Sequence, residues 1–215
     1  MTRTLYTYFR SSAAWRARIA MAIKGLDYTA VPVHLLKDGG QQHSADYHAV
    51  NPQGLIPALV DDGATVSQSL AICEYLEERY PQPPLLPADL LARTQARSLA
   101  YAIACDIHPI NNLRVLQYLK GTLGVSQESA DDWYRHWIAV GFAGIEAELA
   151  RLGSLRFCVG DAVSLADICL VPQVFNARRF KLDLTPYPHI VAIDAHLMTL
   201  PAFADTQPAK QPDAE

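Results

Sequence analysis

Two adjacent serines, Ser11 and Ser12, stand where a strand pattern gives way to a helical pattern. Residues 4–8 have the aromatic and β-branched content of a short strand, while Trp15 and Ile19 recur at helical spacing. A serine at such a junction can cap the helix, whose free N–H groups and positive end attract an anion. We therefore predict that Ser11 or Ser12 caps a helix start that suits an anion; the alternative is a cap with no ligand.

A second junction of the same kind follows at Gln68 and Ser69. Residues 64–66 are typical of a strand, and the apolar residues from Leu70 to Tyr80 keep a helical period. The free donors at this helix start suit a carboxylate, and an ordinary cap is again the alternative.

The segment between these junctions offers backbone groups to a ligand. Pro57 precedes a short apolar strand, and the Ile56–Pro57 bond is a candidate cis peptide. That conformation would turn the N–H and C=O groups of Ile56 outward, where an extended peptide can pair with them. The polar stretch 37–44, which contains Gln42, is expected to be a surface loop that reaches a ligand.

Short strands and two helices must position these residues. The strand at 4–8, the first helix and a strand at 28–33 form a βαβ unit, whose two strands should be parallel. A turn at 61–63 then joins two further strands as a hairpin, ahead of the second helix. This βαβ-ββα order predicts a small α/β domain.

Four prolines between residues 81 and 87 indicate a domain boundary, because proline continues neither a helix nor a central strand. Beyond it the pattern is helical: 89–119 with an interruption at Pro109, 127–152, a helix from 165 with a kink at Pro172, and 188–200. Ser164 and Asp167 form a capping box for the third of these helices. The polar tail should lie over the surface or fray.

The predicted organisation is therefore an α/β domain at 1–82, a proline-rich linker at 83–88 and an all-helical domain at 89–215.

Composition excludes several classes of protein. The net charge of -4 and the absence of a basic run argue against a nucleic-acid partner. No signal-peptide pattern or membrane-length apolar stretch occurs, which predicts no membrane contact and a cytoplasmic location. The cysteines form no C-x-x-C pair and the histidines no H-E-x-x-H pair, so we expect buried cysteines and no metal site.

Residues 11–16, Ser-Ser-Ala-Ala-Trp-Arg, resemble the S-S-C-x-W-R signature of zeta-class glutathione transferases. The resemblance runs over nearly the whole chain, and Ala13 stands where the signature often has cysteine. Further similar stretches are 38–42, 68–72, 163–167, 170–174 and 183–188.

The resemblance implies the glutathione transferase fold: a thioredoxin-like domain with a mixed four-stranded sheet, followed by an all-α domain. It implies a homodimer that uses glutathione as a cofactor. The activity implied is the cis–trans isomerisation of maleylacetoacetate to fumarylacetoacetate in tyrosine and phenylalanine catabolism. A glutathione thiolate adds to the double bond, the single bond rotates, and the thiolate leaves.

Site residues follow from the same resemblance. Ser11 is the expected donor to the thiolate, with Ser12 in reserve and Arg10 beside them. Glutathione is expected to contact the signature residues Ser11, Ser12, Ala13, Ala14, Trp15 and Arg16, together with Gln42, Ile56, Gln68, Ser69, His108 and Asn112.

The substrate that the resemblance implies is a dicarboxylate, and a guanidinium matches a carboxylate with two parallel hydrogen bonds. Arg10, Arg114 and Arg179 are therefore the expected substrate-binding residues, each with a solvated surface position as its alternative. Rival functions are maleylpyruvate isomerisation, conjugation or dehalogenation of small electrophiles with glutathione, and a non-catalytic interaction module.

Overall fold

The computed structural model describes residues 2–215, which form two compact units. One unit comprises the chain up to Leu85 together with Leu200–Glu215, and the other is Leu86–Thr199. The first boundary lies close to the expected linker, but the last sixteen residues group with the α/β unit and not with the helical domain to which the sequence pattern assigned them. Each unit is described by itself.

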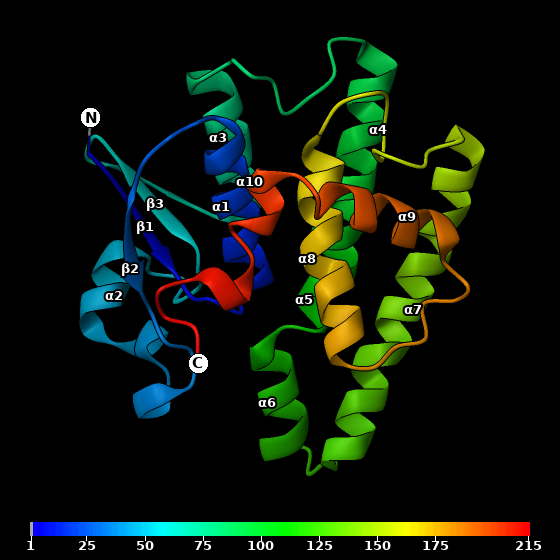
Figure 1. Ribbon diagram of the computed structural model, residues 1–215. Coiled ribbons are helices and arrows are strands. Elements are labelled where there is room, and N and C mark those ends of the chain that lie inside the picture. The colour runs from blue at the N-terminus through cyan, green and yellow to red at the C-terminus, as the bar shows by residue number, and fades with distance from the viewer. Residues whose placement is uncertain (1) are drawn as a thin grey trace. The chain divides into compact units, whose positions relative to one another are not determined.

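The α/β unit contains a mixed four-stranded sheet in the order β2-β1-β3-β4, which confirms the predicted fold (Figure 1). β1 pairs in parallel with β2 and antiparallel with β3, and β3 pairs antiparallel with β4. The strands are β1 (Arg3–Thr7), β2 (Thr29–Pro32), β3 (Ala58–Asp61) and β4 (Ala64–Ser67). The helices are α1 (Ser12–Ile23), α2 (Ala45–Val50), α3 (Ser69–Arg79) and α10 (Pro201–Ala204), with 3₁₀ turns at Lys37–Gly39, Gln41–His43 and Pro208–Lys210.

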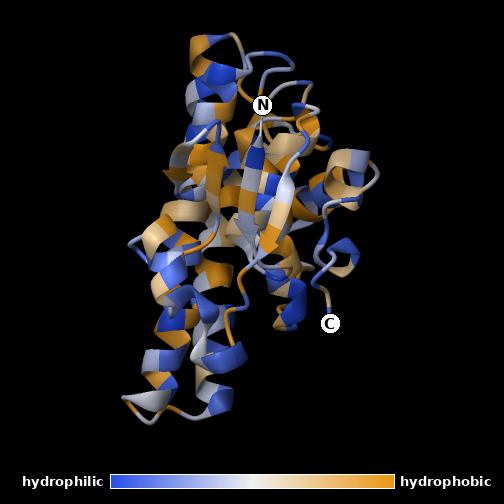
Figure 2. Cartoon of the chain, turned by 90° about the vertical axis from the view of Figure 1, so that its left-hand side faces the viewer, coloured by the Kyte–Doolittle hydropathy of each residue, from blue (hydrophilic) through white to orange (hydrophobic). Residues whose placement is uncertain are grey.

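Helices α1 and α3 pack together on one side of the sheet (Figure 1). Alanines such as Ala14, Ala17 and Ala20 are fully buried along α1, and small side chains allow this close approach. The other side of the sheet, seen in Figure 2, carries both hydrophilic and hydrophobic strand residues. The packing of α1 against α3 on this side of the sheet fixes the β1–α1 junction.

Two expected backbone features are present in this unit. Asp62 and Gly63 both have positive φ angles in the two-residue turn between β3 and β4, the conformation that a tight hairpin requires. The Ile56–Pro57 peptide is cis.

The second unit is helical throughout its regular elements, as expected. The helical pattern at 89–119, expected to be interrupted at Pro109, forms α4 (Leu90–Tyr101), a π-helical turn (Ala102–Ile107), α5 (His108–Ile110) and α6 (Leu113–Gly121). The interruption at Pro109 is therefore present, because proline lacks the N–H that would continue the helix. Gly141 lets a later helix pack closely against the π-helical turn, because a Cβ atom there would lie 2.3 Å from the Ile107 side chain. The remaining helices are α7 (Gln127–Leu152), α8 (Leu165–Arg179) and α9 (Pro188–Leu197).

Asp167 anchors the start of α8, where the predicted capping box is present. Its carboxylate accepts hydrogen bonds from the backbone N–H groups of Cys158 and Ser164, both at 2.7 Å, and from the Ser164 hydroxyl at 2.8 Å. Burial raises the pKa of Asp167, although these hydrogen bonds act in the opposite direction. Helix α8 continues through Pro172.

One expectation from the sequence is wrong: Cys105 is exposed, whereas Cys73, Cys158 and Cys169 are buried. Of the two alternatives for the polar tail, it lies over the surface of the α/β unit and does not fray. It forms α10 and a 3₁₀ turn, and Phe203 and Pro208 are buried. No helix within residues 2–215 is long and apolar enough to span a membrane.

Replacing Asp167 should destabilise the protein strongly. Asp167→Ala leaves three buried donors without their acceptor, so we expect the free energy of unfolding to fall by about 3–5 kcal/mol. Urea denaturation followed by circular dichroism measures this change. Asp89→Ala is the matched control, because Asp89 caps α4 at an exposed position and its loss costs about 1 kcal/mol. Equal losses in the two variants would contradict the role given to burial.

Candidate functional site

Ser11 is the N-cap of α1. Its backbone is extended, and its Oγ accepts a hydrogen bond of 3.1 Å from the N–H of Ala14. Ser12 is the first residue inside the helix and is buried. Of the two serines, Ser11 is therefore the one that caps, and with its oxygen engaged by Ala14 its hydroxyl proton can be donated to a ligand.

A buried cation lies at the start of α3. Arg16 is 1% exposed, and its Nη1 donates to the Ser69 Oγ across 3.3 Å. Its Nε and Nη2 are buried and have no hydrogen-bond partner within residues 2–215. Helix α3 begins at Ser69 without a side-chain cap, so its positive end and the free guanidinium donors meet at one place. A carboxylate at this point would satisfy both, which is the chemistry of an anion site.

Gln68 precedes this helix in an uncommon conformation. Its φ is +70°, a left-handed value that costs a non-glycine residue roughly 1–3 kcal/mol. Its side-chain Nε2 donates to the Gln53 Oε1 across 2.7 Å, and the residue is exposed. Such strain is concentrated at ligand sites, because ligand contacts over-determine the backbone there.

Gln42 and Ile56 belong to the same unit. Gln42 is buried, and its Oε1 has no hydrogen-bond partner in the described chain. Gly40 permits this placement, because its φ is +101° and a Cβ there would lie 2.5 Å from the Gln42 Nε2. The segment before Ile56 is fixed at the carbonyl of Leu55, which accepts 2.6 Å hydrogen bonds from Tyr47 and Asn51.

The other residues of the 11–16 signature have structural partners. The N–H of Ala14 is used by the Ser11 cap, and the indole N–H of Trp15 donates to the Thr206 Oγ1 across 2.9 Å. Ala13 is half-buried and offers only a methyl group. Within residues 11–16, Ala14 and Trp15 thus have hydrogen-bond partners inside the α/β unit, whereas Arg16 retains unbonded donors.

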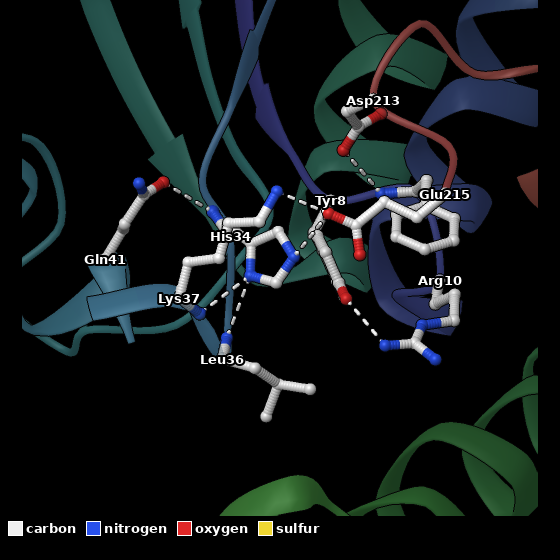
Figure 3. Close-up of polar contacts among 9 residues, drawn as sticks. Tyr8, Arg10, His34, Leu36, Lys37, Gln41, Asp213 and Glu215 are labelled. Atoms are coloured by element: carbon white, nitrogen blue, oxygen red, sulfur yellow. Dashed lines mark hydrogen bonds and ion pairs between the residues drawn. The ribbon is translucent and has the colours of Figure 1, made fainter. Parts of the chain in front are cut away.

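Arg10 lies beside Ser11 and is held by aromatic side chains. Its Nη2 donates to the Tyr8 hydroxyl across 2.9 Å, and its guanidinium lies 5.0 Å from the centre of the Phe9 ring (Figure 3). One edge of the planar guanidinium is used in this way.

Four predicted site residues lie in the helical unit. His108 begins α5, and Asn112 is the N-cap of α6, with its Oδ1 accepting from the N–H of Arg114 at 3.1 Å. Arg114 is exposed. Arg179 is the last residue of α8, exposed, with its guanidinium 4.6 Å from the centre of the Phe180 ring. Phe180 in turn stacks on Tyr134 at 3.6 Å.

Sequence reasoning missed two features of the site. The motif named Arg16, but nothing in the sequence shows that its guanidinium is buried with two free donors. The positive φ of Gln68 likewise has no sequence signal, because glycine is the residue that usually marks such a position. No cluster of three or more His, Cys, Asp or Glu side chains among residues 2–215 could hold a metal ion.

A mixed sheet with two helices on one side, followed by a helical unit, is the architecture of glutathione transferases. Residues 5–84 match the family model "Glutathione S-transferase, N-terminal domain", and residues 138–201 match "Glutathione S-transferase, C-terminal domain". A probable maleylacetoacetate isomerase of Vibrio cholerae is 53% identical over 214 residues, which cover 100% of this chain and 99% of the relative. The chain therefore belongs to the glutathione S-transferase family.

Two solved structures are similar over their full length. A holo structure of a bacterial maleylpyruvate isomerase, described as a zeta-class glutathione S-transferase, has a TM-score of 0.94 and 47% identity, covering 99% of this chain and 100% of that one. A maleylacetoacetate isomerase of Methylobacterium extorquens AM1, with bound malonate and glutathione, has a TM-score of 0.94 and 42% identity, covering 99% of each chain. The zeta-class resemblance of the sequence is confirmed.

Proposed function

We propose that this protein converts maleylacetoacetate to fumarylacetoacetate by reversible addition of glutathione. The predicted class of activity, a glutathione-dependent isomerase, agrees with the names of its relatives. One observation supports the assignment of its chemistry: the Ser11 Oγ accepts a hydrogen bond from the Ala14 N–H, so its hydroxyl proton is available for donation to a sulfur anion.

A hydrogen bond from Ser11 is strong enough to lower the pKa of the glutathione thiol to near neutral pH. A free cysteine thiol has a pKa of about 8.5, so only a small fraction is ionised at pH 7. A hydrogen bond to the thiolate, worth about 1.5–3 kcal/mol, lowers that pKa by roughly one to two units. The positive end of α1 adds up to about 1 kcal/mol. Together these effects make the thiolate a major species at neutral pH.

The γ-glutamyl carboxylate and the peptide backbone of glutathione have matching hydrogen-bonding groups in the α/β unit. The γ-glutamyl carboxylate suits the start of α3, where Ser69, Gln68 and the free donors of Arg16 lie. The cysteinyl backbone pairs with Ile56, in the manner of a peptide added to an extended segment. The unbonded Oε1 of Gln42 accepts an N–H of the tripeptide. In the helical unit, His108 and Asn112 remain proposed glutathione contacts.

Isomerisation requires a nucleophile that both adds and leaves. Addition of the thiolate to the cis double bond makes a single bond that can rotate, and elimination restores glutathione with the trans product. The Ser11 hydroxyl stabilises the sulfur anion before addition and after elimination. Because Ala13 replaces the cysteine often found in the signature, no thiol at residue 13 takes part, and Ser11 alone must suffice as the side-chain donor.

The dicarboxylate substrate calls for cations, and Arg10, Arg114 and Arg179 are the proposed partners of its carboxylates. Arg10 keeps donors beyond the one that it gives to Tyr8. Arg114 and Arg179 are exposed and have side chains available for a ligand. Maleylpyruvate is the second candidate substrate, because one of the similar solved structures is a maleylpyruvate isomerase. A homodimer and a cytoplasmic location remain part of the proposal.

Ser11→Ala should lower turnover by about 10- to 1000-fold, the range for removing one donor from a reacting anion. The measurement is the initial rate of loss of the cis substrate at saturating glutathione. Ser126→Ala is the matched control: it removes an N-cap hydroxyl of α7 with the same 3.1 Å bond, so it costs similar stability without touching the thiolate. Full activity in a folded Ser11→Ala variant would contradict the role of Ser11.

Arg16→Met should weaken the binding of glutathione without lowering the free energy of unfolding. Methionine fills a similar volume without burying an unpaired charge, so the free energy of unfolding of the ligand-free protein should stay the same or rise. Affinity for glutathione, measured by calorimetry, should fall at least about tenfold, since a charged hydrogen bond is worth about 1.5–3 kcal/mol. Unchanged affinity would show that no carboxylate binds at Arg16.

Two measurements distinguish the candidate activities: the rate with each cis substrate, and the total free thiol during turnover. With either maleylacetoacetate or maleylpyruvate, an isomerase regenerates glutathione, so total free thiol should remain constant while the cis substrate disappears. We expect maleylacetoacetate to have the higher kcat/KM. Preference for maleylpyruvate would identify the second candidate, and stoichiometric consumption of thiol would indicate a conjugating transferase instead.

A further inference from the structure

The end of the chain contacts the segment that leads into Ser11. The backbone N–H of Phe9 donates a 2.9 Å hydrogen bond to the Oδ2 of Asp213, a residue 204 positions away (Figure 3). The indole of Trp15 donates to the Oγ1 of Thr206, also across 2.9 Å. We call residues 206–213 the tail strap. It contacts both the β1–α1 segment and α1 itself.

The buried side chain of Arg18 also binds the segment between β1 and α1. It is fully buried, and its Nη1 donates to the Thr7 Oγ1 at 2.9 Å while its Nη2 donates to the Phe9 carbonyl at 3.0 Å. Its Nε donates to the carbonyl of Thr206 at 3.2 Å. Burial lowers the pKa of Arg18 to about 10, and the nearby charge of Asp213 acts against this change, so the group stays charged at neutral pH. One buried cation thus joins the segment to the tail strap.

We propose that Asp213 is a positioning residue for the proposed catalytic hydroxyl of Ser11. Phe9 is fixed on both sides, with its N–H bound by Asp213 and its C=O bound by Arg18. The next link is the turn in which the N–H of Ser11 donates to the Tyr8 carbonyl at 3.0 Å. Asp213 thereby acts on the sulfur anion through Ser11, and this inference rests on the role proposed for Ser11.

Glu215 offers a contrast on the same tail. Its carboxylate pairs with Lys37 and lies 3.4 Å from the His34 Nε2, but its side chain is 49% exposed (Figure 3). Exposed pairs of this kind contribute little to stability. Glu215→Gln therefore removes a tail charge and an exposed contact while leaving the Phe9–Asp213 bond in place.

The experiment compares Asp213→Ala, Asp213→Asn and Glu215→Gln in the full chain. We expect Asp213→Ala to lower kcat about tenfold, because small displacements of a catalytic group have large kinetic effects. The KM for glutathione should stay within about twofold of the value for the unchanged protein. The pKa of the bound thiol, read from thiolate absorbance, should rise. Asp213→Asn keeps an acceptor and should retain most of kcat, and Glu215→Gln should match the unchanged protein.

Amide hydrogen exchange at Phe9 gives a readout that is independent of activity. Exchange at this amide should be faster in Asp213→Ala and unchanged in Glu215→Gln. If Asp213→Ala fails to fold, a chain that ends at Gln211 is compared with one that ends at Ala214, and the same differences are expected.

Unchanged kcat and unchanged exchange at Phe9 would overturn the inference. A loss of kcat with an unaltered thiol pKa would also overturn it, because the effect would not pass through Ser11. These outcomes are distinct from failure of the proposed function, in which the unchanged protein would not isomerise the substrate or Ser11→Ala would leave the thiol pKa unaltered.

Discussion

The hydrogen bond from the N–H of Ala14 to the hydroxyl of Ser11 is the interaction on which the rest of the site depends. In this bond the Ser11 oxygen accepts from a free N–H of the first turn of α1. The hydroxyl proton is not used in the cap and can be donated to another group. The cap holds the Ser11 oxygen at the start of α1, and a donor positioned before charge develops is how preorganised sites stabilise anions. The buried face of α1 keeps this cap in place.

The two buried arginines of α1 differ in the hydrogen bonds that their guanidinium groups make. Arg16 and Arg18 are both buried, but residues two apart on a helix do not face the same way. Arg18 directs its guanidinium to the backbone of the β1–α1 segment and to the tail strap, so its charge is used within the fold. Arg16 keeps two unbonded donors beside the start of α3, and in the proposed function these donors bind the γ-glutamyl carboxylate.

Local signals in the sequence predicted much of this fold. The Ser11 cap, the capping box of Ser164 and Asp167, the hairpin at Asp62–Gly63 and the long helix at 127–152 each depend on residues close together in the chain. Features that depend on distant partners were not predictable. The tail strap joins residues 204 positions apart, and its polar composition left open whether the tail lies over the surface or frays. The close approach of Ile107 to Gly141 in α7 likewise joins distant parts of the chain and has no local signal.

A crystal structure of the protein with bound glutathione tests the central claim most directly. The distance to measure joins the glutathione sulfur to the Oγ of Ser11, with the Ala14–Ser11 cap bond retained. The account predicts that the sulfur lies within hydrogen-bonding distance of this oxygen. A sulfur that instead pairs with another donor, beyond reach of the Ser11 hydroxyl, would contradict it.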